Sequence, residues 1–167
     1  MRILYNSPLS LKGVLLSLIV FACSPAFAEG PSLDIIEYKN NEITRNYTVS
    51  IEDLSKLPQT TIETTTIWTE GVQTFVGPSF KTIVEDLLGD VTEVVAVAVN
   101  DYIIDIPIEH ATENGPIFAI KHNGEFMTIR SKGPIWIIYP YDSDERFQTE
   151  EVYSRSVWQL LALEIER

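Results

Sequence analysis

The run from Val91 to Val99 constrains the fold more than any other segment, because it consists almost entirely of valine and alanine. Such a run is typical of a strand that the rest of a protein covers on both faces. We therefore expect a central strand here, buried on both faces. A strand of this kind needs packed layers around it, so the chain has to form a core.

Other segments have the patterns of helices and short strands. Ser79–Leu88 is the clearer helix, with apolar residues at three- and four-residue intervals and Gly89 at its end. A shorter helix follows Ser50, which can cap it, and ends at Pro58. The expected strands cover residues 33–38, 43–49, 60–67, 102–106, 117–121, 125–129, 135–139 and 160–166, with Asn123-Gly124 as a hairpin turn. The sequence thus predicts an α+β fold of compact, mixed β-sheets with two principal helices.

Residues 1–28 are predicted to be a signal peptide. A positively charged start precedes an apolar run at residues 14–22, and Ala26-Phe27-Ala28 matches the pattern before a signal peptidase site. Cleavage after Ala28 would leave residues 29–167 as a single periplasmic domain. The alternative is a lipoprotein signal ending at Cys23, which its flanking residues fit less well. No later segment is apolar enough for stable membrane insertion.

Charge and cysteine content exclude several classes of function. With 24 acidic and 12 basic residues the net charge is −12, so nucleic acid is an unfavourable partner. The one cysteine, Cys23, lies in the predicted signal, so the mature chain would have no thiolate metal ligand. We expect His110 and His122 at surface or turn positions. The acidic run Asp142–Glu145 lacks the glycine and the distant glutamate of an EF-hand, which indicates a solvated loop.

Aromatic, hydroxyl and cationic residues gather at the expected strand ends, whereas motifs of common catalytic sites are absent. Rings can stack on a flat heteroaromatic ligand, and polar side chains can bond to its edge. We expect core packing for Trp136, and for Trp68 and Trp158 core packing remains an alternative. The sequence predicts a ligand site with no catalytic and no metal-binding residue, formed by Trp68, Thr69, Asn100, Asp101, Tyr102, Arg130, Lys132, Tyr141, Ser154, Arg155, Ser156 and Trp158.

Short motifs follow one another in a definite order over most of the chain. They are Val49-Ser50-Ile51-Glu52-Asp53-Leu54, Leu57-Pro58, Gly77-Pro78, Asn100-Asp101-Tyr102, Ile106-Pro107, Phe118-Ala119, Asn123-Gly124-Glu125, Gly133-Pro134, Tyr139-Pro140 and Trp158. In this order, from about Tyr47 to Glu166, the chain resembles the molybdopterin-binding domain of the sulfite oxidase family, in a small exported version. The resemblance implies a compact α+β domain of mixed sheets.

One position departs from the enzymes of this family. They carry a cysteine soon after the threonine-rich strand, and its thiolate binds molybdenum; this chain has Trp68 at about that place. An indole offers an N–H donor and an aromatic face but no soft, charged sulfur. We therefore expect a cavity for a reduced, metal-free pterin, and neither molybdenum nor oxygen-atom transfer. A molybdopterin-dependent oxidoreductase with another ligand in place of cysteine stays an alternative.

Two further segments, Trp68–Gln73 and Tyr153–Leu160, resemble those of periplasmic pterin-binding proteins that act with membrane-bound cyclic-di-GMP enzymes. This implies that the protein relays pterin occupancy to the periplasmic part of a membrane sensor protein. A third possibility is an acidic scaffold whose pocket is vestigial.

The roles of the site residues in pterin binding are our own hypotheses. Trp68 and Tyr102 would stack on the pterin ring, and Asn100 and Asp101 would pair with its amino-pyrimidinone edge. The polar tail would be held by Arg130, Lys132, Ser154, Arg155 and Ser156. For Arg155, an ion pair with Glu150 or Glu151 is an equal alternative.

Overall fold

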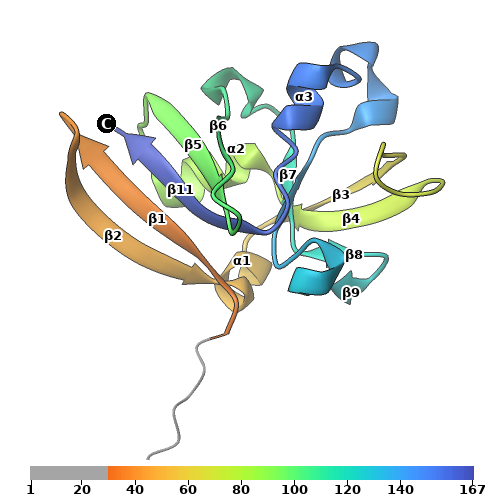
Figure 1. Cartoon of the computed structure of the whole chain (residues 1–167), viewed down its shortest axis with the longest axis horizontal. Coiled ribbons are helices and arrows are strands. Elements are labelled where there is room, and N and C mark those ends of the chain that lie inside the picture. The colour runs from red at the N-terminus through yellow and green to blue at the C-terminus, as the bar shows by residue number, and fades with distance from the viewer. Residues whose placement is uncertain (1–29) are drawn as a thin grey trace, which may run out of the picture.

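The computed structural model describes residues 30–167 (Figure 1). The predicted signal peptide therefore lies outside the described residues. On one side of the molecule a five-stranded sheet has the order β2-β1-β11-β5-β6. Its strands are β1 (Ser32–Lys39), β2 (Glu42–Ser50), β5 (Glu93–Ala98), β6 (Ile103–Asp105) and β11 (Leu160–Glu166). The pair β1–β11 is parallel and the other pairs are antiparallel.

A second sheet, on the opposite side of Figure 1, has the order β3-β4-β8-β9. Its strands are β3 (Gln59–Thr64), β4 (Gln73–Pro78), β8 (Lys121–His122) and β9 (Glu125–Phe126). Between the sheets, β7 (Ile117–Ala119) pairs with β10 (Trp136–Ile138). These mixed sheets and few helices confirm the α+β fold class predicted from the sequence.

The helices are short. The first, α1 (Ile51–Lys56), is capped as expected, because the Ser50 hydroxyl accepts the Asp53 amide at 3.0 Å and donates to its carboxylate. The expected helix at residues 79–88 forms α2 (Phe80–Ile83) and continues as a π-helix (Val84–Leu88). A third helix, α3 (Glu150–Ser154), was not predicted. No helix within residues 30–167 combines the length and the apolar character that a membrane span requires.

The prediction that the Val91–Val99 strand is buried on both faces is wrong. Along β5, buried residues such as Val94 and Ala96 alternate with half-buried ones such as Val95 and Val97. One face of the strand therefore packs into the core, and the other is covered only in part. Valine on the partly covered face is still favourable, because β-branched side chains pack well on the surface of a sheet.

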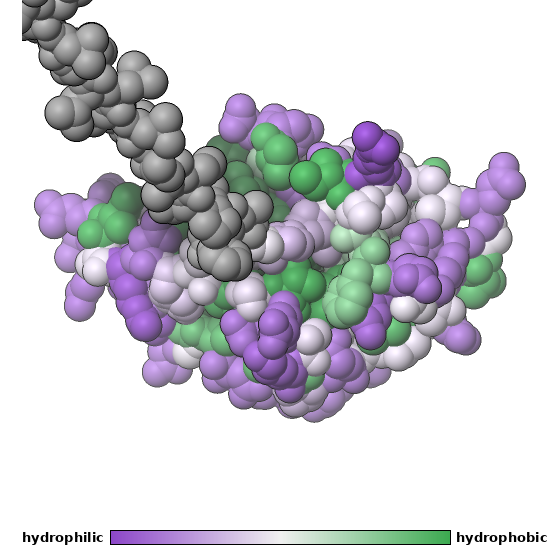
Figure 2. Space-filling view, turned by 90° about the horizontal axis from the view of Figure 1, so that it is seen from below, coloured by the Kyte–Doolittle hydropathy of each residue, from purple (hydrophilic) through white to green (hydrophobic). Residues whose placement is uncertain are grey.

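The core lies between the sheets and includes Phe75, Phe80, Phe118 and Trp136, all fully buried. Strand β4 was missed in the sequence because its glycine and proline are typical of loops. Its Gly77 lies so close to Phe118 that a Cβ atom there would be 2.0 Å from the Phe118 carbonyl oxygen. Seen from below, the surface is mostly hydrophilic, with small hydrophobic groups between (Figure 2).

Candidate functional site

A cavity of about 340 Å³ lies between the β5–β6 hairpin, the β3–β4 loop and the segment that joins α3 to β11. This volume is in the range of small-molecule sites. The walls are lined by Trp68, Ala98, Asn100, Tyr102, Tyr153, Ser154, Ser156, Val157 and Trp158. Six of these nine belong to the site predicted from the sequence: Trp68, Asn100, Tyr102, Ser154, Ser156 and Trp158.

The aromatic wall is built around Trp68. Its partly buried indole meets four rings edge-on, with centroids between 5.6 and 6.4 Å away: Trp136, Tyr141, Tyr153 and Trp158. The loop that carries it is fixed at its start, because the Asp142 carboxylate accepts both the backbone N–H and the hydroxyl of Thr65, each at 2.6 Å. Trp68 thus combines core packing with a face on the cavity.

The other side of the cavity is fixed by hydrogen bonds to the backbone near α3. The Tyr102 hydroxyl donates to the Ser154 carbonyl at 3.0 Å and joins the hairpin to the end of α3. The fully buried Trp136 donates its indole N–H to the Ser156 carbonyl at 3.1 Å, so the prediction that Trp136 lies in the core is confirmed. These bonds occupy polar groups of the wall, and four aromatic residues are among those that line the cavity.

Buried hydroxyls behind the wall satisfy one another. The Ser156 hydroxyl donates to the Val152 carbonyl at 2.9 Å and is 2.6 Å from the Tyr141 hydroxyl, which therefore donates to it. Burial raises the pKa of Tyr141, so this phenol keeps its proton. No side-chain N or O atom buried in residues 30–167 lacks a hydrogen-bond partner.

Six predicted site residues do not line the cavity. The Thr69 hydroxyl bonds to Thr66 at 2.7 Å, Asp101 is exposed at the hairpin turn with φ 61°, and Tyr141 is buried behind Trp68. The other three are the cations Arg130, Lys132 and Arg155. Their proposed contacts with a ligand stay predictions.

The three cations have different surroundings. Arg155 is 2.7 Å from the Glu151 carboxylate and also bonds to Asp105, so the structure has the ion pair that was its alternative role. Lys132 places its ammonium group 4.4 Å from the Trp158 ring centroid, and Arg130 is exposed. Among the described residues no cation lines the cavity, and a polar tail would have to reach beyond these walls to meet one.

Sequence reasoning missed three lining residues: Ala98, Tyr153 and Val157. The small apolar residues Ala98 and Val157 carry no signal that distinguishes them from the core. Tyr153 belongs to the motif Tyr153–Leu160, and its ring beside a serine and an arginine could have marked it.

The walls offer no thiolate, carboxylate or imidazole, and residues 30–167 contain no group of three or more potential metal ligands. The donor set therefore fits a flat organic ring and does not fit molybdenum. Both histidines are half-buried and hydrogen-bonded. His110 lies 3.0 Å from the Tyr139 hydroxyl, and His122 lies at the β8–β9 turn, 2.9 Å from Gln73. Burial lowers the pKa of both imidazoles.

No protein-family model and no curated protein matches the sequence. The fold is similar to that in a crystal structure of the sulfane dehydrogenase SoxCD from Paracoccus pantotrophus, with a TM-score of 0.55 and 14% identity. The similarity covers 81% of this chain and 38% of that chain, so it concerns little more than a third of the larger protein. It shows a distant relationship of fold, in agreement with the predicted sulfite oxidase-type architecture.

Proposed function

We propose that this protein binds a reduced, metal-free pterin in the cavity beside Trp68 and reports its presence to a membrane sensor protein in the periplasm. The observation that carries the proposal is the position of Trp68. At the place where the resembling enzymes hold a metal-binding cysteine, this chain has an indole that forms part of a cavity wall.

The cavity has the chemistry that a pterin ring requires. The rings of Trp68, Tyr102 and Trp158 supply faces and edges for a flat bicyclic guest. The amide of Asn100 supplies a polar group for the edge of the ring. A ring held in this way would be recognised by shape and stacking, with few hydrogen bonds.

The signalling role is supported by the sequence segments Trp68–Gln73 and Tyr153–Leu160. These two segments carry the resemblance to periplasmic pterin-binding proteins, and both of them contribute residues to the cavity walls. The segments that carry the resemblance and the proposed pterin site therefore lie in the same part of the molecule. Cyclic-di-GMP regulation by the sensor is part of the proposal on this ground.

A second candidate is a molybdopterin-dependent oxidoreductase, which the fold similarity to a sulfane dehydrogenase favours. Elemental analysis of protein purified from a host that makes the cofactor separates the two. Molybdenum in stoichiometric amount would support the oxidoreductase and contradict the proposed function.

The direct test is a fluorescence titration of the purified protein with a reduced pterin. Replacing Trp68 by alanine should weaken binding about tenfold or more, because a stacking face is lost. Since this ring also packs against four others, Trp68→Phe is the second variant; it retains part of the packing and should lose several-fold. Phe126→Ala removes an exposed ring from β9, outside the cavity walls, and should leave affinity unchanged. Lack of saturable binding at micromolar pterin contradicts the proposal.

A further inference from the structure

Lys132 contacts the aromatic wall of the cavity but is not one of its lining residues. Its ammonium nitrogen is 4.4 Å from the centroid of the Trp158 ring and 5.5 Å from that of Trp136. Trp158 lines the cavity and Lys132 does not. Trp158 is therefore the residue that contacts the Lys132 ammonium group and also lines the cavity.

The backbone holds Lys132 in this place. It follows the short 3-10 helix Ile129–Ser131 with a left-handed φ of 70°, and its carbonyl accepts the Gln159 N–H at 2.9 Å. Gln159 is the residue after Trp158, so the lysine and the indole are tied together through adjacent backbone. Within residues 30–167 Lys132 has no carboxylate partner at ion-pair distance.

The surroundings of the Lys132 ammonium group differ from those of Arg155, the other cation near the wall. Arg155 is neutralised by Glu151 and Asp105, whereas the half-buried ammonium of Lys132 faces two π systems. A cation on one face of an indole draws electron density toward itself and adds positive potential beyond the ring. In the part of the chain that the structure describes, no carboxylate lines the cavity to oppose this potential.

We propose that Lys132 sets the charge preference of the cavity, so that it takes electron-rich flat rings in neutral or anionic form and disfavours cationic ones. Lys132 acts through Trp158 and is a specificity-determining, positioning residue. This inference rests on the proposed function, because it specifies which charge state of the ligand the cavity accepts. It replaces the tail-binding role expected for Lys132 from the sequence.

The test follows the dissociation constant of a fully oxidised pterin from about pH 6 to about pH 9, a range in which lysine stays charged. The oxidised form is used because the amide of its ring loses its proton at mildly alkaline pH, whereas that of a reduced ring does not. In the native protein the anion should bind at least as well as the neutral ring. In Lys132→Met the affinity should fall relative to native protein as pH rises, by about threefold to tenfold at the alkaline end, because the attraction between the ammonium group and the anionic ring is lost. Lys132→Arg should restore the native profile.

Lys121 provides a matched control, since its ammonium lies 4.7 Å from the Phe126 ring in the β8–β9 hairpin, outside the cavity walls. Lys121→Met removes the same charge from the same kind of contact and should leave the pH profile unchanged. Lys132→Asn is the second uncharged variant, because asparagine tolerates the left-handed backbone should Lys132→Met fail to fold.

The outcomes separate this inference from the proposed function. If an uncharged Lys132 variant binds pterin with the native pH profile, the inference is wrong while pterin binding stands. If Lys121→Met and Lys132→Met lose the same pterin affinity at alkaline pH, the loss comes from the total charge of the protein. That result would also contradict the inference. If the native protein binds no pterin at any pH, the proposed function fails and the inference fails with it.

Discussion

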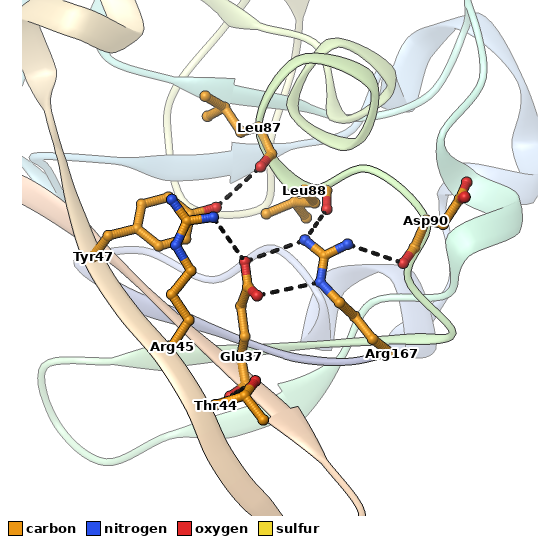
Figure 3. A network of polar contacts seen from close by, with 8 residues as sticks. All are labelled: Glu37, Thr44, Arg45, Tyr47, Leu87, Leu88, Asp90 and Arg167. Atoms are coloured by element: carbon orange, nitrogen blue, oxygen red, sulfur yellow. Dashed lines mark hydrogen bonds and ion pairs between the residues drawn. The ribbon is translucent and has the colours of Figure 1, made fainter.

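The two ends of the five-stranded sheet are built from different chemistry. Strand β11 begins at Leu160, beside the aromatic cavity, and ends next to Arg167 in a cluster of charged groups (Figure 3). There the carboxylate of Glu37, 6% exposed, accepts from Arg167 at 3.1 and 3.3 Å, and Arg45 lies 3.7 Å away. One end of the sheet is stabilised by ion pairs, and the other by packing between aromatic rings.

The charged end also closes the π-helix. Arg167 donates to the carbonyls of Leu88 at 2.5 Å and Asp90 at 3.3 Å, and the Tyr47 hydroxyl donates to the Leu87 carbonyl at 3.0 Å. Burial, and then the nearby Glu37 carboxylate, raise the pKa of Tyr47. Side chains there satisfy carbonyls that a helix end leaves without partners.

The two ends of the sheet differ in whether their side chains are available to a ligand. At the charged end the side chains are occupied by one another and by backbone carbonyls, so this end fixes the structure. At the cavity end the hydroxyls of Tyr102, Tyr141 and Ser156 are also occupied, but the aromatic residues there line a cavity that a ligand can enter. Stability and ligand binding should therefore respond to different substitutions.

The largest expected effect is at the charged end. Glu37→Ala removes the charged hydrogen bonds to Arg167, whose guanidinium stays partly in water, and should lower the free energy of unfolding by about 2 kcal/mol. Pterin affinity, measured where the variant is folded, should not change. Urea unfolding gives the first quantity and fluorescence titration the second. Loss of affinity in the folded variant would contradict the division between the two ends.

A matched pair of tyrosines sharpens the comparison. Tyr141→Phe and Tyr47→Phe each remove one hydroxyl donor, so each should lower the free energy of unfolding by about 1 kcal/mol. Only Tyr141→Phe should weaken pterin binding, about twofold to threefold, because Ser156 lines the cavity and loses its donor. Equal effects of the two variants on binding would show that the ends are not independent.

Local features of this fold could be predicted from the sequence. The Ser50 cap, strand 160–166 and the burial of Trp136 follow from short-range patterns, and the structure has all three. Six lining residues of the cavity were also found, because rings and hydroxyls at strand ends are conspicuous.

Long-range features could not be predicted in this way. Glu37 and Arg167 are 130 positions apart, and nothing local indicates that they meet. Lys132 was expected to hold the polar tail of the ligand, because a cationic side chain suggests an anionic partner. In the structure its ammonium group lies near Trp158, and its backbone is left-handed. The π-helix depends on donors from distant residues to its last carbonyls, so its periodicity indicated only an ordinary helix.

The smallest expected effect concerns the anchor of the Trp68 loop. Hydrogen bonds from the side chain and then the backbone of Thr65 hold the pKa of Asp142 below its ordinary 3.8. A lowered pKa means that the carboxylate stabilises the fold above the ordinary value, and this contribution is lost as pH falls through the lower one. Acidification below about pH 4 should therefore loosen the loop and change Trp68 fluorescence. Asp142→Asn should weaken this response, whereas Asp53→Asn, which removes another exposed carboxylate of lowered pKa in α1, should leave it intact. If the fluorescence change is identical in native protein and Asp142→Asn, a group other than Asp142 anchors the loop and the prediction is wrong.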